Sequence, residues 1–400
     1  MKTSRTGSKI TIVGIGEAGL VGLKPAARAL IENAKVLVGG ARHLAMIPES
    51  RALRIEWTDL SATLEAIEAH ANEDLVVLAS GDPMWFGLGA TLAKRFGPER
   101  LFVVPTPGAF SLAAARLGWP LQETLCLTVH GRPLENILLH LAPGQKLLVL
   151  GEDTFTPMKI ADLLRSGGFK SSRITILSNL GGPRERIVQG VQAGLGLDVI
   201  AIDCVADNAA AALSRAPGLP DEAYEHDGQI TKRDIRAATL ARLSPLPGQT
   251  LWDIGAGAGS VAIEFLRAVS SAKAVAFEKN PERAARIGRN ALALGVPALE
   301  IVTGSAPEVL QNREERPDAV FVGGGVSIPG LLECAWKALN PGGRLVANAA
   351  TIEGEASLLA WQKAEGGDLV RLSVDHLESV GAFKVWKPAI PVVQYCKVKT

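Results

Sequence analysis

The sequence predicts an α/β protein in which two different units follow each other along the chain. Both units begin with a short apolar strand, at residues 10–15 and 251–254, that runs into a glycine-rich turn and then an amphipathic helix. Such alternation is typical of parallel sheets covered by helices. Between the units, residues 207–227 combine an alanine run, Pro, Gly and acidic residues without an apolar period, which predicts a linker. We therefore expect a domain at 8–210 (subdomains about 8–118 and 119–210), a linker at 211–227 and a domain at 228–400.

The composition argues against several classes of protein. Hydrophobic residues make up 47% of the chain, charged residues 21%, and the net charge is +1. A neutral chain carries no overall field that would attract nucleic acid or an anionic membrane. The four cysteines are far apart, without a CxxC pair, which argues against a disulfide framework or a zinc site. With no signal peptide and no run of about 20 apolar residues, we expect a cytoplasmic protein without metal, nucleic-acid or membrane partners.

The first glycine turn matches a dinucleotide-binding pattern that the following strand does not support. Gly14, Gly16 and Gly19 fit GxGxxG. In dinucleotide-binding folds, the next strand is followed by an acidic residue that binds a ribose hydroxyl. The predicted strand at 36–38 is followed instead by Gly-Gly-Ala-Arg-His. The missing acidic residue therefore argues against a nicotinamide site.

Three later strands of the first unit end in polar, glycine-containing loops. The strand at 75–79 is followed by Ser-Gly-Asp-Pro, the strand at 101–104 by Pro-Thr-Pro-Gly-Ala-Phe-Ser, and the strand at 125–129 by His130-Gly-Arg-Pro. Ligands of open α/β folds bind at the carboxyl ends of parallel strands. The alternative is that these are plain turns, because Gly, Asp and Pro all favour turns. His130 could act as an acid or base near neutral pH, or only form a structural hydrogen bond.

The second glycine turn follows a different pattern. Gly255, Gly257 and Gly259 fit GxGxG, and Ser260 stands where the dinucleotide pattern requires its third glycine. The next predicted strand, 274–277, ends at Glu278, about 20 residues further on, where a carboxylate can bind ribose hydroxyls. The alternative is a tight strand-to-helix turn without a ligand. Further strands are predicted at 299–303, 319–322 and 344–349, and the segments 369–374, 383–386 and 392–398 suit an antiparallel edge.

A basic helix start precedes this second turn, in the segment GQITKRDIRAATLARL. Thr231 is the expected N-cap, with Asp234 three residues on. Lys232, Arg233 and Arg236 crowd the first turns, where cations oppose the helix dipole. This favours a binding role over the alternative of a solvated basic face.

The first unit resembles the tetrapyrrole (corrin/porphyrin) methylases in VGIGEAGLVGLKPAARALIENAKVLVGGARHL, VVLASGDPMWFG and PTPGAFSLAAARLGWP. The resemblance implies two α/β subdomains that enclose S-adenosylmethionine. It implies cofactor contacts by Gly81, Asp82, Pro83 and Ser111, with Phe86 and Phe110 as apolar walls, and places Gly14 and Gly16 beside the tetrapyrrole.

The second unit resembles the class I, Rossmann-like S-adenosylmethionine methyltransferases through its GxGxG turn and Glu278. This resemblance implies a second S-adenosylmethionine site in the same chain. The expected contacts are Thr231, Gly255, Ala256, Gly257, Ala258, Gly259, Glu278, Ser305 and Ala306.

The pairing of these units resembles the two-domain precorrin methyltransferases of cobalamin biosynthesis. It implies methylation of a precorrin macrocycle at C5 and C15 with decarboxylation of the C12 acetate (precorrin-6B to precorrin-8X), in a homo-oligomer. The substrate carries carboxylates, which arginine binds well, so we expect substrate contacts from Arg42, His130, Arg132, Lys232, Arg233 and Arg236. The sequence identifies no catalytic residue, and the macrocycle itself can accept electrons. The alternatives are an RNA or protein methyltransferase, for which the sequence lacks a basic, aromatic surface, and a non-catalytic ligand sensor.

Overall fold

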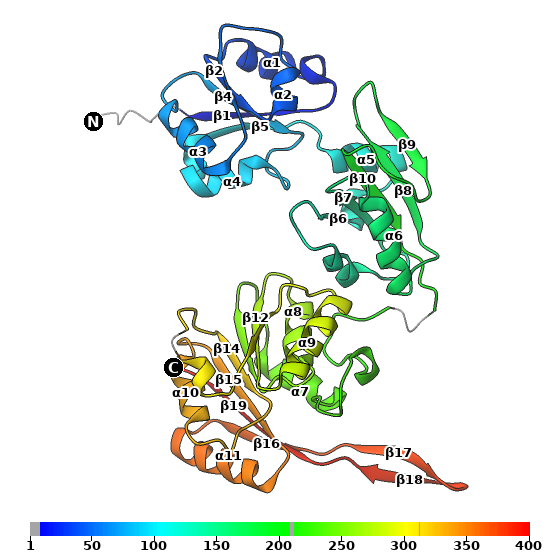
Figure 1. Cartoon of the computed structure of the whole chain (residues 1–400), viewed down its shortest axis with the longest axis vertical. Coiled ribbons are helices and arrows are strands. Elements are labelled where there is room, and N and C mark those ends of the chain that lie inside the picture. The colour runs from blue at the N-terminus through cyan, green and yellow to red at the C-terminus, as the bar shows by residue number, and fades with distance from the viewer. Residues whose placement is uncertain (1–8, 209–211, 312) are drawn as a thin grey trace. The chain divides into compact units, whose positions relative to one another are not determined.

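The computed structural model describes residues 9–208, 212–311 and 313–400. The chain forms two compact units (Figure 1). Unit 1 comprises the described residues up to Arg132 together with Ala142–Asp207, and unit 2 comprises Pro133–Leu141 together with the described residues from Asn208 onward. The expected boundaries at residues 8, 210 and 211 lie outside the described residues.

The first lobe of unit 1, residues 9–118, contains a five-stranded parallel sheet in the order β3-β2-β4-β1-β5. Its strands are β1 (Ile10–Ile15), β2 (Val36–Gly39), β3 (Leu53–Glu56), β4 (Leu75–Ser80) and β5 (Leu101–Val104). The helices are α1 (Pro25–Glu32), α2 (Ala41–Ala45), α3 (Leu60–Ala69), α4 (Leu88–Phe96) and α5 (Ala109–Leu117), with short 3-10 helices η1 (Gly19–Gly22) and η2 (Pro98–Arg100).

Both faces of this sheet are buried, which explains why its strands are apolar without alternation. Ile12 and Val77 point into one core with residues of α3 and α4, and Val13 and Leu78 point into the other with residues of α1 and α2. The parallel arrangement brings the loops after β1, β2 and β4 to one edge of the lobe.

The second lobe of unit 1, residues 119–132 and 142–207, contains a mixed sheet in the order β6-β7-β10-β8-β9. Its elements are η3 (Leu121–Glu123), β6 (Thr124–Thr128), β7 (Lys146–Leu150), α6 (Thr156–Ser166), β8 (Arg173–Ser178), β9 (Arg186–Gln189) and β10 (Asp198–Asp203). β6 and β7 are parallel, whereas β10 runs antiparallel to β7 and β8. β6 agrees with the strand predicted at 125–129.

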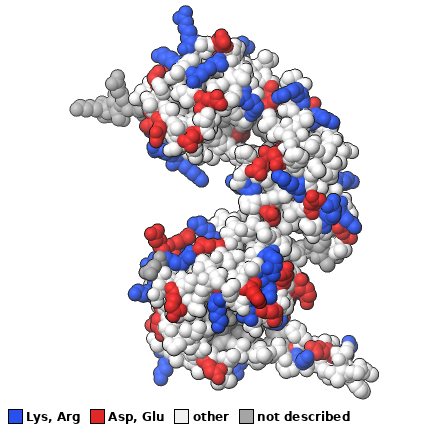
Figure 2. Space-filling view, in the orientation of Figure 1, with Lys and Arg blue, Asp and Glu red and all other residues white. Residues whose placement is uncertain are grey.

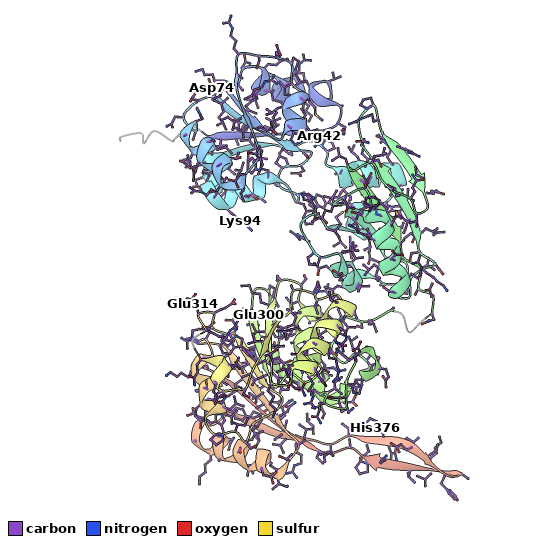
Figure 3. The ribbon with its side chains drawn as sticks, viewed as in Figure 1. Arg42, Asp74, Lys94, Glu300, Glu314 and His376 are labelled. Atoms are coloured by element: carbon purple, nitrogen blue, oxygen red, sulfur yellow. The ribbon has the colours of Figure 1, made fainter. Side chains whose placement is uncertain are left out.

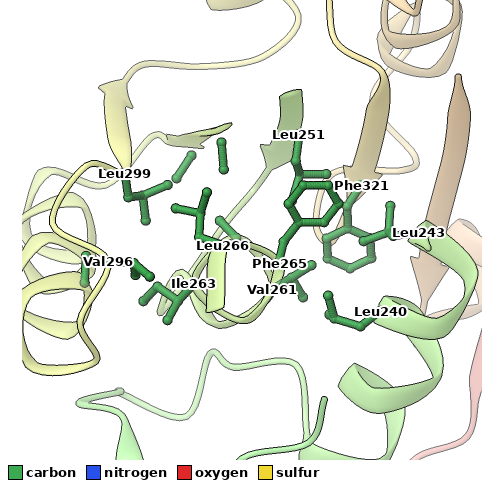
Figure 4. Packing of buried hydrophobic residues seen from close by; sticks show 14 of the residues in the cluster. Leu240, Leu243, Leu251, Val261, Ile263, Phe265, Leu266, Val296, Leu299 and Phe321 are labelled. Atoms are coloured by element: carbon green, nitrogen blue, oxygen red, sulfur yellow. The ribbon is translucent and has the colours of Figure 1, made fainter. Parts of the chain in front are cut away.

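Unit 2 is built on a seven-stranded sheet in the order β13-β12-β11-β14-β15-β19-β16. The strands are β11 (Thr250–Ile254), β12 (Lys273–Glu278), β13 (Glu300–Thr303), β14 (Ala319–Val322), β15 (Arg344–Ala349), β16 (Asp368–Leu372) and β19 (Val392–Val398). The helices are α7 (Arg233–Leu243), α8 (Ser260–Ala268), α9 (Pro281–Ala293), α10 (Leu331–Ala338) and α11 (Ile352–Glu365), with 3-10 helices η4 (Leu134–His140), η6 (Asp221–Ala223) and η7 (Glu308–Leu310). Figure 4 shows the core in which Leu240 and Leu243 of α7 pack on Phe265 and Phe321.

The antiparallel edge differs in part from the prediction. β19 runs antiparallel to β15 and β16, as expected. The segment 383–386 does not join this sheet: it lies in β18 (Phe383–Pro388), which pairs with β17 (Asp375–Val380) in a separate hairpin. In Figure 1 this hairpin projects from the rest of unit 2.

The start of unit 2 also differs from the prediction. Residues 212–227 are not bare connecting chain, because η6 lies within them and Leu219 and Tyr224 are buried. Helix α7 has Lys232, not Thr231, at its N-cap, and no side chain caps it. At the start of α9, Asn280 caps the helix by accepting hydrogen bonds from the amides of Glu282 and Arg283.

Candidate functional site

A cavity of about 800 Å³ in unit 1 is lined by residues of both lobes. This volume lies in the upper part of the range for ligand pockets. Most lining residues follow the carboxyl ends of β1, β2, β4 and β5 in the first lobe and of β6, β7 and β8 in the second, and residues 196–199 at the start of β10 add to them. Nine predicted site residues line it: Gly16, Arg42, Gly81, Asp82, Phe86, Phe110, Ser111, His130 and Arg132.

The end of β1 and the loops after β4 and β5 meet through bare backbone beside this cavity. A Cβ atom on Gly14 would lie 1.9 Å from the carbonyl oxygen of Gly81. Gly81 has φ +54°, and its own Cβ would lie 2.7 Å from Cα of Gly108. The amide of Gly81 donates to Ile15 and its carbonyl accepts from Thr106. Any side chain at Gly14 or Gly81 would therefore force the loops apart.

Two predicted site residues do not line the cavity. Gly14 is packed against Gly81, so its role in the structure is this backbone contact. Pro83 is buried, and its carbonyl accepts from the amide of Gly89. Both residues shape the loops, whereas Gly16, with nothing within 4 Å of a built Cβ, lies at the cavity wall.

An aromatic group forms one wall. The rings of Trp85 and Phe86 lie 5.5 and 6.0 Å from that of Phe110, and Phe86 has a φ of +52°. A positive φ is unfavourable for a bulky residue and recurs at functional sites. The guanidinium of Arg132, from the second lobe, lies 5.3 Å from the Phe86 ring centre. A flat apolar surface with a cation at its edge suits a conjugated ligand that carries carboxylates.

Arg42 is fixed by side chains from three elements. It forms an ion pair with Glu17, which follows β1, and its Nη2 donates to Ser80 Oγ at the end of β4 (2.9 Å). The same nitrogen lies 2.9 Å from Nε2 of His43. Burial and the neighbouring Arg42 charge lower the pKa of His43 to about 4, so this imidazole is neutral at pH 7. Figure 3 labels Arg42 and Lys94, two cations of the first lobe that line the cavity.

The sequence interpretation missed several residues of this cavity. Most of them follow a strand or lie in a helix next to a predicted loop, whereas Asp198 begins β10. None of them forms a sequence motif by itself. Asn179, just after β8, has a positive φ of 49° and is buried at the wall. The missed lining residues with polar or aromatic side chains include Glu17, His43, Trp85, Lys94, Asn179 and Asp198.

The glycine turn of unit 2 follows β11 and requires glycine at each of its three positions. Gly255, Gly257 and Gly259 have φ values of +71°, +60° and +75°. A Cβ on Gly257 would lie 2.8 Å from the carbonyl oxygen of Gln229, and one on Gly259 would lie 2.7 Å from Ile287. The turn therefore has no room for side chains at these positions between β11 and α8. Its backbone is fixed by hydrogen bonds, because the amides of Gly255 and Ala256 donate to the Phe277 carbonyl.

The Glu278 carboxylate lies against this turn, as the sequence predicted. Its Oε2 accepts from the amide of Gly257 (2.9 Å) and its Oε1 from that of Asn280 (3.0 Å). The loop after β13, which contains Ser305 and Ala306, adjoins it, because the amide of Gly304 donates to the Glu278 carbonyl. Of the predicted contacts in the turn, Ala258 is fully buried and Ala256 half-buried.

A second carboxyl group is buried under the turn. Asp253 of β11 is 1% exposed, and its Oδ2 accepts from the amide of Ala262 (3.0 Å). Burial raises the pKa of Asp253 to about 7, against the effect of this hydrogen bond, and the Glu278 charge adds to the increase.

The predicted basic substrate contacts of unit 2 divide into two kinds. Lys232 and Arg233 are exposed. Nζ of Lys232 lies 3.7 Å from Oδ2 of Asp221, and Nε of Arg233 donates to the carbonyl of Gly218 (2.8 Å). The prediction for Arg236 is wrong, because its side chain is fully buried and bound to Glu264, Asp221 and backbone carbonyls. It has no donor to offer a ligand at the surface.

Within the described ranges, we find no helix with the length and apolar content needed to cross a membrane. The same residues contain no cluster of three or more His, Cys, Asp or Glu side chains that could hold a metal ion. On the face drawn in Figure 2, Lys and Arg are interspersed with Asp and Glu.

Comparison with family models matches each unit separately. Residues 9–195 match the tetrapyrrole (corrin/porphyrin) methylases, and residues 222–399 match a precorrin methyltransferase domain. The two matches agree with the two resemblances seen in the sequence.

Individual relatives match the chain over both units or over one. A Sinorhizobium protein named precorrin-6Y C(5,15)-methyltransferase [decarboxylating] is 45% identical over 98% of this chain and 96% of its own length. A Mycobacterium tuberculosis protein of the same name is 39% identical over 98% of this chain and 100% of its own. A Salmonella typhimurium cobalt-precorrin-7 C(5)-methyltransferase is 32% identical over 48% of this chain and 98% of its own. Since the first two alignments span both units, the chain belongs to the family of decarboxylating precorrin-6Y C(5,15)-methyltransferases.

Proposed function

We propose that this chain is an S-adenosylmethionine-dependent enzyme that methylates a precorrin macrocycle at C5 and C15 and removes the C12 acetate carboxyl in cobalamin biosynthesis. Sequence similarity to decarboxylating precorrin-6Y C(5,15)-methyltransferases over nearly the whole chain supports this activity. The observation that carries the proposal is that each unit places a glycine loop at the carboxyl edge of its own parallel sheet. Two separate sites in one chain fit two methylations.

Unit 1 is the proposed site of C5 methylation. The Salmonella relative named C(5)-methyltransferase is matched over 98% of its own length and covers 48% of this chain, about the length of one unit. The tetrapyrrole methylase match at residues 9–195 supports assigning the C5 reaction to unit 1. The cavity of about 800 Å³ offers room for both a methyl donor and part of a macrocycle. Gly81, Asp82 and Ser111 would hold the donor, while Phe86, Phe110 and Arg132 would contact the ring and its carboxylates.

Unit 2 is the proposed site of C15 methylation and decarboxylation. Two features of its turn support S-adenosylmethionine binding: the three glycines keep the turn free of side chains, and the Glu278 carboxylate lies against it, where it can accept a hydrogen bond from a ribose hydroxyl. Lys232 and Arg233 are exposed at the start of α7, close in sequence to Gln229, whose carbonyl faces Gly257. These two cations are the proposed carboxylate contacts of unit 2.

S-adenosylmethionine supplies an activated methyl group, so the protein needs no nucleophile of its own. The residues of each site hold the reacting carbon in line with the methyl and exclude water. For decarboxylation, the conjugated macrocycle accepts the electrons that the departing carboxylate leaves behind. The chain must therefore position and desolvate that carboxylate, and paired cations at the rim of the site would keep the remaining carboxylates in place.

This proposal is tested by substituting one residue in each unit and asking whether C5 methylation and C15 methylation with decarboxylation are lost separately. In the full chain, Asp82→Ala should reduce C5 methylation and spare C15 methylation and decarboxylation. Gly257→Arg should abolish the latter two, because φ is +60° and Gln229 leaves no room for a side chain. Mass analysis of the product and calorimetry of S-adenosylmethionine binding give the readouts, with two sites per wild-type chain expected. Loss of the same step in both variants would contradict independent sites.

Self-association and a cytoplasmic location complete the proposal. All four cysteines are free thiols, which fits a reducing compartment. The β17–β18 hairpin exposes Leu377, Val380, Phe383 and Trp386, each at least 55% exposed, on strands that pair only with each other among the described residues. An isolated two-stranded hairpin is marginally stable in water, and exposed apolar clusters are typical of interfaces. This supports a homo-oligomer.

A further inference from the structure

We propose that His130 accepts the proton that the macrocycle loses when unit 1 methylates it. This inference rests on the proposed C5 methylation and adds the residue that completes it. It follows from the chemistry of the step and from the state of every other potential base at the cavity.

The charge balance of the reaction requires a proton acceptor. The methyl–sulfur bond breaks with its electrons remaining on sulfur, and a ring carbon uses a pair of its own electrons to form the new carbon–carbon bond. The macrocycle thereby gains one positive charge, which it loses by releasing a proton. A base with a pKa near the working pH serves this step best.

Two carboxylates at the cavity are already committed to other groups. Glu17 is mostly buried and paired with Arg42 and Arg184. Asp198 is 5% exposed and accepts from Ser178 Oγ and from the amides of Leu195 and Gly196. Protonating either would break an ion pair or leave several buried donors without an acceptor.

Two further carboxylates are more accessible but support the backbone of the loops. Asp82 Oδ1 accepts from the amide of Met84 (2.9 Å), within the loop proposed to hold the methyl donor. Glu152 Oε1 accepts from the amide of Gly131 (3.3 Å). Carboxylates are ordinarily weak bases at neutral pH. Asp82 and Glu152 are therefore the alternative proton acceptors, and His130 is the preferred one.

His43, the other histidine at the cavity, is unsuited to this role. Its Nε2 lies 2.9 Å from Nη2 of Arg42, and because arginine can only donate, the lone pair of Nε2 is already in use. Its pKa is lowered to about 4 by burial and by the Arg42 charge. Nδ1 is buried without a hydrogen-bond partner among the described residues, so it cannot exchange a proton with a ligand.

His130 combines access with a free ring. It follows β6 and is exposed at the cavity, and among the described residues none forms a hydrogen bond to its imidazole that would occupy a lone pair. Its backbone is nevertheless fixed, because its amide donates to Thr128 Oγ1 (3.2 Å) and Gly131 turns the chain at a φ of +63°. The cations that share the cavity with it are Arg42, Lys94 and Arg132.

The test uses the full chain with precorrin substrate and S-adenosylmethionine. In His130→Gln, we expect the rate of C5 methylation to fall by about 10²-fold or more, the contribution typical of general base catalysis. The intermediate that has gained one methyl and lost carbon dioxide should accumulate, because unit 2 is untouched. Added imidazole should restore part of the rate in His130→Ala.

Matched variants separate the possible outcomes. His70→Gln, on the surface of unit 1 beside Glu73, should behave as wild type. Calorimetry should find unchanged S-adenosylmethionine binding in His130→Gln, which would exclude misfolding. An unchanged rate of C5 methylation in His130→Gln would overturn the inference, as would a larger loss of rate in Glu152→Gln. Failure of the wild type itself to methylate C5 would instead contradict the proposed function of unit 1.

Discussion

Arg236 and Glu264 form an ion pair that is closed to solvent. Nε of Arg236 lies 2.5 Å from Oε1 of Glu264, and the two side chains are 0% and 2% exposed. Glu264 also accepts from the amides of Gly218 and Leu219 and from the Tyr224 hydroxyl. The pair therefore attaches residues 218–224 to helices α7 and α8, and its role is structural.

We expect Arg236→Met to destabilise unit 2 by about 3–5 kcal/mol, because removing one partner leaves a buried charge uncompensated. Native-state hydrogen exchange of the α8 amides measures this loss as a free energy of opening. In the same assay, Arg289→Met should cost less than about 1 kcal/mol, since Arg289 and its partner Glu225 are more than half exposed.

The same pair of variants separates a structural from a substrate-binding role for Arg236. If Arg236 bound the substrate, Arg236→Met would raise KM for the C15 reaction without weakening the hydrogen-exchange protection of α8. Unchanged protection in Arg236→Met would therefore contradict the structural assignment. The double variant Arg236→Met with Glu264→Gln should recover part of the lost stability, because it removes both buried charges.

Gly14 and Gly16 provide a second matched comparison. Gly14→Ala should abolish C5 methylation and lower the thermal stability of unit 1, because its Cβ would lie 1.9 Å from the Gly81 carbonyl oxygen. Gly16→Ala should leave stability unchanged, because nothing lies within 4 Å of its Cβ. Product mass analysis and thermal denaturation provide the measurements. If Gly14→Ala and Gly16→Ala both kept wild-type stability and C5 methylation, the close contact of β1 with the loop after β4 would not be required for either.

Sequence patterns could predict the units, most strands and the loops that line the cavity, because these depend on local apolar periods and on glycine. They could not identify the partners that decide the role of each polar residue. Arg236 resembles a basic helix start in sequence, but Glu264, 28 residues away, binds it in the core. Gly14 fits a ligand motif, but it faces Gly81. The Gly81 and Glu278 placements could be predicted because strand order alone brings them to the sheet edge.

Asp253 gives unit 2 a specific pH dependence. Its folded-state pKa of about 7 exceeds the ordinary value of about 3.9, so the folded state binds the proton more tightly. Protonated Asp253 therefore contributes its full stabilisation to the folded state below about pH 4. This contribution decreases as the pH rises to about 7, and above that pH it no longer changes. Relative to Asp253→Asn, wild type should lose on the order of 4 kcal/mol across this range.

Urea denaturation at several pH values measures this difference for Asp253. The asparagine can keep the hydrogen bond from the Ala262 amide, so the comparison isolates the ionisation. Asp375→Asn, in the exposed hairpin, serves as the control and should show no comparable change. A constant difference between wild type and Asp253→Asn from pH 4 to 7 would contradict the raised pKa.

The β17–β18 hairpin carries apolar side chains on both of its faces. Leu377 and Trp386 pair across the strands on one face, and Val380 and Phe383 pair on the other. Since Trp386 is 70% exposed, Trp386→Asp should keep the fold and weaken self-association at least tenfold, as loss of about 1.4 kcal/mol at an interface would do. Light scattering across a concentration series measures the effect. Ile352→Asp, at a residue 79% exposed on α11, is the matched control and should leave association unchanged. If wild type and Trp386→Asp have the same mass at every concentration, the hairpin is not the contact between copies.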